Sequence, residues 1–179
     1  MRALIGDKQH SFEELHEFDG TYAFSAEYRF RVNIYLHYGG YALNFRLIPQ
    51  VIRTIEELNL PPQLHKLAKL ERGLVLVTGT TGSGKSTLLA SVIDEINKTS
   101  RKHIITIEDP IEYIYNDRKS IIEQREIGKH TQSFSSALRA ALREDPDVIV
   151  VGEIRDLDTA EYITSCKHRS FGFFNSAHT

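Results

Sequence analysis

The sequence predicts an α/β protein whose larger part is a parallel sheet covered by helices. Three nearly continuous apolar runs are typical of strands buried on both faces: GLVLVTG (73–79), HIITIEDPIEY (103–113) and DVIVVGEIRD (147–156). Between them lie two segments, 86–98 and 133–145, with apolar residues at helical spacing. Strand and helix patterns that alternate along a chain favour a parallel sheet.

The first buried strand runs into GTTGSGKST, which fits the phosphate-loop pattern G-x-x-x-x-G-K-[ST]. Its glycines allow backbone angles that let successive N–H groups surround a polyphosphate. Lys85 is expected to reach the β- and γ-phosphates, and the Ser86 hydroxyl to bind Mg²⁺. The predicted nucleotide-binding residues are Gly79, Thr80, Thr81, Gly82, Ser83, Gly84, Lys85, Ser86 and Thr87.

Acidic side chains follow the other two buried strands. Glu153 comes directly after VIVVG, at the Walker B position, and Glu108, Asp109 and Glu112 cluster after HIITI. In an open α/β sheet the carboxyl ends of the strands meet at the ligand-binding edge, where a group is needed to hold Mg²⁺ or orient water. The pattern alone does not choose between the three acids that follow HIITI.

Composition narrows the function classes. The chain has 179 residues, of which 41% are hydrophobic, enough for one large domain or two small ones. A net charge of −2 gives no reason to expect nucleic acid, and no metal-ligand spacing joins the eight histidines. A single cysteine, Cys166, fits a reducing cytoplasm, and no apolar run or leader indicates a membrane span.

The first part of the chain differs from the rest. Residues 21–48 alternate apolar and polar side chains, with a hairpin turn at Gly39-Gly40, and predict antiparallel strands. Segments 11–18 and 51–59 are expected to be helical, and a short helix over 63–73 follows Pro61-Pro62. The expected organisation is an N-terminal domain over 1–60, a linker over 61–72 and the phosphate-loop domain over 73–179.

Taken together, these stretches resemble the secretion and pilus ATPases, most closely the PilT branch of type IV pilus retraction motors. The segments that carry the resemblance are FRVNIYLHYGGYALNFRLIP, IEELNLP, RGLVLVTGTTGSGKSTLLA, HIITIEDPIEY, QREIG and ALRAALREDPDVIVVGEIRDLDTAE. The block QREIG favours the retraction branch. Thr81 departs from the family, which usually has proline at that position.

The resemblance implies a shortened PAS-like N-terminal domain followed by a RecA-like motor domain, here truncated. It implies ATP and Mg²⁺ as ligands, a homo-hexamer with ATP between subunits, and an inner-membrane pilus platform protein as partner. The protein is expected in the cytoplasm, at the inner face of the membrane. Its work would be pilus retraction, which drives twitching motility.

The resemblance also implies roles for single residues. Glu112 matches the proposed general base of the family's Asp box, and Glu153 the Walker B glutamate, which acts on Mg²⁺ through water. Arg31 and Arg46 match arginines that point at phosphates, where they would offset transition-state charge. His178 matches the His box, thought to sense the γ-phosphate.

The resemblance stops at Tyr162. The family would continue as something like AISQAANTGHLVFSTLHT, whereas this chain reads YITSCKHRSFGFFNSAHT. Codons can be chosen for Tyr162–Thr179 such that dropping the first base yields ISQAANTGHLVFSTLHT. We therefore predict that 162–179 is a frameshifted tail, and that the missing last strands leave the sheet with an exposed edge.

Two alternatives stay open. One is a pilus-assembly or type II secretion ATPase, which shares the chemistry and does the opposite work. The other is a nucleotide-binding remnant without turnover, which the broken C-terminal segment favours. A DNA-translocating RecA-like protein is weaker, because no basic patch interleaved with aromatic residues is present.

Overall fold

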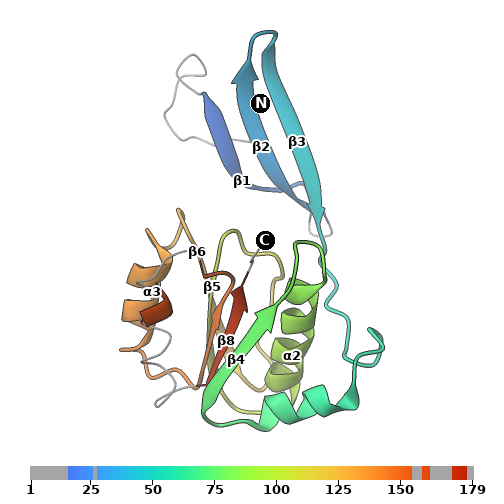
Figure 1. Ribbon diagram of the computed structural model, residues 1–179, viewed down its shortest axis with the longest axis vertical. Coiled ribbons are helices and arrows are strands. Elements are labelled where there is room, and N and C mark those ends of the chain that lie inside the picture. Colours follow the sequence, from blue (N-terminus) through green and yellow to red (C-terminus); the bar gives the residue numbers. More distant parts are fainter. Residues whose placement is uncertain (1–15, 26–27, 155–158, 162–170, 177–179) are drawn as a thin grey trace. The chain divides into compact units, whose positions relative to one another are not determined.

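The computed structural model describes residues 16–25, 28–154, 159–161 and 171–176 (Figure 1). The chain divides into two compact units, Met1–Gln50 and Val51–Thr179, which are called here the N-terminal unit and the motor unit. Among the described residues, no helix has the length and apolar character needed to cross a membrane.

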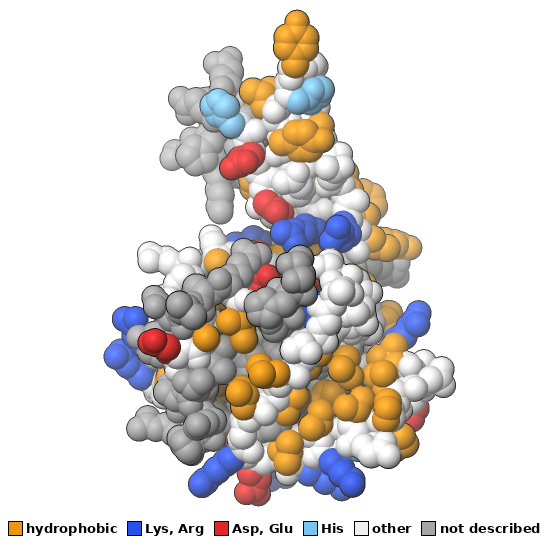
Figure 2. All heavy atoms as spheres, in the orientation of Figure 1, with side chains coloured by type: hydrophobic (Ala, Val, Ile, Leu, Met, Phe, Trp, Pro, Cys, Tyr) orange, Lys and Arg blue, Asp and Glu red, His pale blue; other side chains and the backbone are white. Residues whose placement is uncertain are grey.

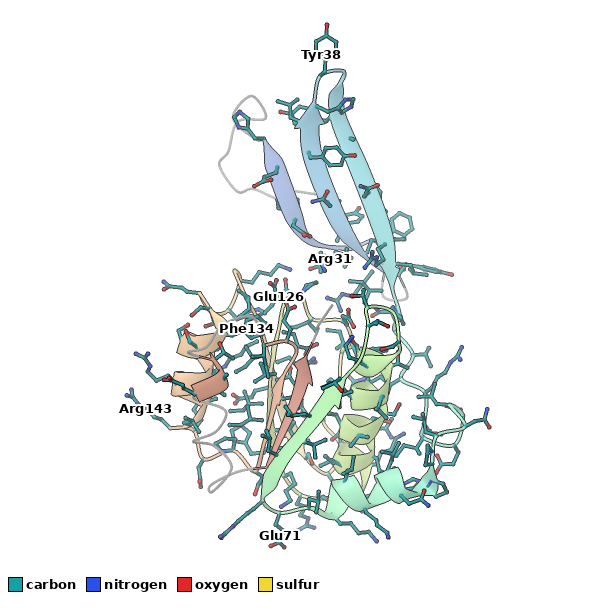
Figure 3. All side chains as sticks on the ribbon, in the orientation of Figure 1. Arg31, Tyr38, Glu71, Glu126, Phe134 and Arg143 are labelled. Atoms are coloured by element: carbon teal, nitrogen blue, oxygen red, sulfur yellow. The ribbon has the colours of Figure 1, made fainter. Side chains whose placement is uncertain are left out.

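The N-terminal unit contains the predicted antiparallel sheet. Strands β1 (Glu17–Ala23), β2 (Arg29–His37) and β3 (Gly40–Ile48) lie in that order. β2 and β3 are joined at the predicted hairpin, with Tyr38 at its tip (Figure 3). Gly40, at a φ of 120°, supplies a backbone angle that side chains rarely adopt. Val32 and Ile34 of β2 are buried, as the alternating pattern requires.

The motor unit is built on a five-stranded sheet, parallel throughout. Its strands are β4 (Gly73–Thr78), β5 (His103–Glu108), β6 (Ile121–Glu126), β7 (Val148–Val151) and β8 (Phe171–Ser176). They lie in the order β4-β8-β7-β5-β6. The three apolar runs form β4, β5 and β7, so the predicted parallel α/β sheet is confirmed.

Helices cover both faces of this sheet. Helix α2 (Lys85–Thr99) packs with Ile104 of β5 and Val148 and Val150 of β7 in one apolar cluster. Helix α3 (Phe134–Ala141) packs with the alternate residues of the same two strands in a second cluster. Since neighbouring residues of a strand point to opposite faces, the sheet lies between the two helices. Ser133 caps the start of α3, because its Oγ accepts the backbone N–H of Ser136.

The segment that precedes β4 departs from the prediction. No helix forms over 51–59; residues 55–59 make turns, and the 3₁₀ helix η2 (Pro62–Lys69) follows. Ile55 and Ala68 belong to the apolar cluster under α2, so the stretch after Gln50 packs with the motor unit. The boundary between the two units therefore lies after Gln50, earlier in the chain than the predicted boundary near residue 60. Of the expected helix over 11–18, the described part runs into β1, because Glu17 and Phe18 pair with β2.

Residues 171–176 lie within the segment predicted to be a frameshifted tail, and they nevertheless form a strand of the sheet. They form β8, which pairs in parallel with β4 on one side and β7 on the other. Figure 1 shows this strand, in red, inside the sheet. The physical reason is that strand pairing uses backbone groups, and Phe-rich segments favour extended structure. The edge strand on this side is β4; its Leu74 and Leu76 are exposed, and Figure 2 shows hydrophobic side chains on the visible face of the motor unit.

Candidate functional site

The loop between β4 and α2 has a geometry suited to a phosphate. Gly79, Gly82 and Gly84 have φ angles of 154°, 81° and 91°, which side chains rarely adopt. A Cβ atom on Gly79 would lie 2.8 Å from the Ser83 Oγ. These backbone angles favour glycine at all three positions, of which the motif fixes Gly79 and Gly84, and such a loop can turn its N–H groups toward a phosphate.

The start of α2 adds a cationic group and a helix terminus. The Lys85 Nζ donates hydrogen bonds to the carbonyl oxygens of Gly79, at 2.8 Å, and Thr80, at 2.9 Å. The N-cap residue is Gly84, which has no side chain to accept the first N–H groups of the helix. The ammonium group and the helix N-terminus therefore lie at the same loop, an arrangement that favours a bound polyphosphate.

Glu153, the predicted Walker B residue, lies just past β7, at the carboxyl edge of the sheet. The Gly152 N–H donates to the Ile107 carbonyl, at 2.8 Å, so the two strand ends stay together. A Cβ atom on Gly152 would lie 3.3 Å from that carbonyl oxygen and 3.4 Å from the Glu108 Cα. The structure thus brings Glu153 close to the acidic cluster that follows β5, with its side chain half-buried.

Glu108, the last residue of β5, and Glu112, in the loop that follows, have different surroundings. The Glu108 carboxylate accepts hydrogen bonds from the Thr106 hydroxyl, at 2.7 Å, the Gln124 amide, at 3.3 Å, and the Glu112 backbone N–H, at 3.3 Å. Burial raises the pKa of Glu108, and these donors offset part of that rise. Glu108 therefore holds the following loop, whereas the Glu112 side chain is exposed to solvent.

That loop, Asp109–Tyr115, also touches the phosphate-loop helix. The Tyr113 hydroxyl lies 3.3 Å from the Thr87 Oγ1, in the first turn of α2. Burial holds the pKa of the neighbouring Tyr115 phenol well above its usual range. The loop that carries Glu112 is therefore packed beside the first turn of α2, which carries Lys85 and Ser86, as the prediction of one joint site requires.

Two further candidates lie in the N-terminal unit. Arg31 and Arg46 are direct partners in the register of β2 and β3, so both project from the same face. Arg31 forms an ion pair with Asp19, at 2.9 Å (Figure 3). Like charges that face each other across a strand pair repel, and Asp19 offsets part of that repulsion. A polyanion is the kind of ligand that two adjacent guanidinium groups suit.

The remaining predicted site residue, His178, lies outside the described residues. Within the described part, no group of three or more His, Cys, Asp or Glu side chains is arranged to hold a metal ion. Mg²⁺ fits such a site, because it is usually held by one or two protein oxygens together with phosphate oxygens. Gln124, Thr106 and Tyr113 surround the acids but were not predicted as site residues; for Gln124 the block QREIG was the available signal.

Comparison with known proteins places these features in a family. The family model described as "Type II/IV secretion system protein" matches residues 23–174. The chain belongs to this family. The type IV pilus retraction ATPase PilT of Pseudomonas aeruginosa is 45% identical over 177 residues, 98% of this chain and 52% of its own length. A twitching motility protein of Neisseria gonorrhoeae is 45% identical over 178 residues, 99% of this chain and 48% of its own length.

A solved structure agrees with these relatives. The crystal structure of the pilus retraction motor PilT with bound ADP matches with a TM-score of 0.88 and 48% identity. The match covers 93% of this chain and 49% of that one. The chain spans about half the length of the relatives it matches. The predicted resemblance to the retraction branch and the predicted fold class are confirmed.

Proposed function

We propose that this chain is a motor subunit that binds and hydrolyses ATP to power type IV pilus retraction. The observation that carries the proposal is the geometry of residues 79–87. Three glycines with positive φ, the Lys85 ammonium and the N-terminus of α2 meet at one loop. Membership of a secretion-system family, and ADP in a related structure, support a nucleotide as the polyphosphate.

Different residues of the chain are proposed to bind the phosphates and Mg²⁺. On binding, the Lys85 Nζ would exchange the carbonyls of Gly79 and Thr80 for β- and γ-phosphate oxygens. Ser86, through its hydroxyl, and Glu153, through water, would hold Mg²⁺. When bound, this ion supplies neutralisation of phosphate charge. The oxygen donors at these two positions suit a hard cation.

Glu112 is proposed as the general base that takes the proton of the attacking water. Its exposed carboxylate and its place beside the phosphate-loop helix support this role. Arg31 and Arg46 are proposed to meet phosphates across a domain or subunit boundary, where positive charge lowers the barrier. His178 is proposed as a γ-phosphate sensor, on the resemblance alone.

The wider assembly is proposed from the family. The N-terminal unit would be part of a PAS-like domain, and the motor unit part of a RecA-like domain in a hexameric ring. The ring would work in the cytoplasm, against an inner-membrane platform protein of the pilus. Closure of each subunit interface around ATP would move the two domains against each other and drive pilin removal.

ATP binding and phosphate release by purified protein test the chemistry. Wild type is expected to bind ATP with Mg²⁺ in calorimetry, and Lys85→Ala to lose at least about tenfold in affinity and all turnover. Glu112→Gln should keep binding and lose turnover by about 10²- to 10⁴-fold. Lys66→Ala is the matched control, because Lys66 is an exposed lysine of η2. A wild type that does not bind ATP would contradict the proposal.

Two results would favour the alternatives. Binding that depends on Lys85 but gives no phosphate release favours a nucleotide-binding remnant. Gene deletion separates retraction from assembly or secretion: pili that persist but do not retract support the proposal, and loss of pili supports an assembly ATPase.

A further inference from the structure

Strand β6 carries two side chains that reach the loop Asp109–Tyr115. Side-chain exposure alternates along β6, and Gln124 and Glu126 lie on the more buried face. The Glu126 Oε2 accepts the Ile111 N–H, at 3.3 Å. Figure 3 labels Glu126 at the end of the motor-unit sheet from which this loop starts. Both side chains of β6 thus contact the backbone of this loop.

Gln124 makes more of these contacts than Glu126. Its Nε2 donates to the Tyr113 carbonyl, at 2.7 Å, and to the Glu108 Oε1, at 3.3 Å. Its Oε1 accepts the Tyr115 N–H, at 3.0 Å. A carbonyl and a carboxylate can only accept, and an N–H can only donate, so these partners fix which end of the amide is which.

We propose that Gln124 is a positioning residue, whose carboxamide fixes the loop Asp109–Tyr115 and thereby the place of Glu112 beside the phosphate-loop helix. Along the chain, Glu112 lies between Glu108 and Tyr113, and the Gln124 amide donates a hydrogen bond to each of these two residues. Its own N–H donates to Glu108, which Gln124 also contacts. The carboxamide therefore ties together the strand end, the loop and the residue that follows it. The catalytic meaning of this rests on the proposed function, but the positioning itself does not.

The chemistry at this position requires an amide. Glutamate lacks the donor that the Tyr113 carbonyl and Glu108 need, and methionine has neither donor nor strong acceptor. The charged or titratable groups that face the position are Glu108 from β5, Tyr113 and Tyr115 from the loop, and Glu126 from β6; Asp94 of α2 lies beyond Tyr115. An ionised carboxylate at position 124 would meet Glu108 as a like charge.

Amide hydrogen exchange of the loop tests the positioning without any need for turnover. In Gln124→Met, exchange protection over Ile111–Tyr115 should fall by about three- to tenfold, the factor that corresponds to one or two hydrogen bonds. Gln63→Met is the matched control, since Gln63 is exposed in η2. It should leave the loop's protection within about twofold of wild type. Unchanged protection in Gln124→Met would overturn the proposal.

A second variant separates positioning from simple loss of packing. In Gln124→Glu the loop should be loosened when the new carboxyl is ionised. It should recover as pH falls, because the protonated form regains a donor for the Tyr113 carbonyl. Protection, corrected for intrinsic exchange, should show this recovery in Gln124→Glu and not in Gln124→Met. Parallel pH profiles of the two variants would contradict an amide-specific role.

Where wild type hydrolyses ATP, the rate of turnover tests whether the loop positions Glu112 for catalysis. Gln124→Met should lower kcat by about tenfold or more and change KM by less than about twofold, because the phosphate loop is untouched. An equal loss in nucleotide affinity would count against positioning of Glu112. If wild type has no turnover, the proposed function fails for this chain, while the exchange experiment still decides the role of Gln124.

Discussion

Asn97, in the last part of α2, clamps the segment that follows the acidic loop. Its side chain is 1% exposed, its Nδ2 donates to the Asn116 carbonyl at 2.8 Å, and its Oδ1 accepts the Arg118 N–H at 3.1 Å. Asn97→Ala removes both hydrogen bonds and leaves a small void. Each bond contributes about 1 kcal/mol, and the two backbone groups left behind are only partly reached by water. We expect the free energy of unfolding of the motor unit to fall by about 2 to 3 kcal/mol.

Urea denaturation of the motor unit measures this loss. The midpoint should fall while the slope stays unchanged, because the surface exposed on unfolding is the same. Asn116→Ala is the matched control: Asn116 is exposed, and it contributes its carbonyl, which the substitution keeps. That variant should stay within about 0.5 kcal/mol of wild type. Equal effects of the two substitutions would refute the assignment of the clamp to the Asn97 side chain.

Two further predictions concern the site. Gly79→Ala should weaken nucleotide binding more than Gly82→Ala, because a Cβ meets the Ser83 Oγ at 2.8 Å in the first and nothing within 4 Å in the second. Both carry a backbone cost of about 1 to 3 kcal/mol, and calorimetry with ATP compares them. For Glu108 the folded-state pKa is raised above 4.5, so the folded protein binds the proton more tightly than the unfolded chain. Its contribution should therefore lower stability as pH rises from 4.5 through the folded pKa. Glu108→Gln should remove this slope; the same slope in both proteins would contradict it.

The apolar runs predicted the strands well because β5 and β7 are covered on both faces by α2 and α3. Strand β6 was missed, since its sequence IIEQRE carries charge and it lies at the edge of the sheet. A continuous apolar run marks a strand only where both of its faces are buried. For an edge strand such as β6, the pattern of side chains depends on its position in the sheet, which distant segments of the chain determine.

The expected helix over 51–59 shows how a true local signal can mislead. The Thr54 N–H donates to the Glu57 carboxylate, and the Glu57 N–H to the Thr54 Oγ1, which is the reciprocal capping arrangement of a helix start. One turn follows and then stops, because Asn59 has a left-handed φ of 52° and Pro61 comes soon after. The capping hydrogen bonds form, whereas the length of the helix is set by the residues that follow them.

The candidate site was likewise predictable from the sequence only in part. Sequence spacing found Lys85 and Ser86 and brought the acids to the correct edge, but it left Glu108, Asp109 and Glu112 equivalent. The hydrogen bonds distinguish them, because Glu108 accepts from three donors while the Glu112 side chain is exposed. Such contacts join strand ends with side chains from another strand, and no local pattern encodes them.

The tail gives the last prediction. Residues 171–176 lie between β4 and β7 and pair with both through their backbone groups, and the phenylalanines of FGFF favour extended structure. A shift of reading frame that keeps aromatic, β-forming residues can therefore keep the strand while it changes every side chain that follows. DNA sequencing of the gene tests this. We expect the neighbouring frame after Glu161 to encode a TGHLVF-type block. A neighbouring frame without such a block would contradict the frameshift, and the tail would then be ordinary sequence divergence.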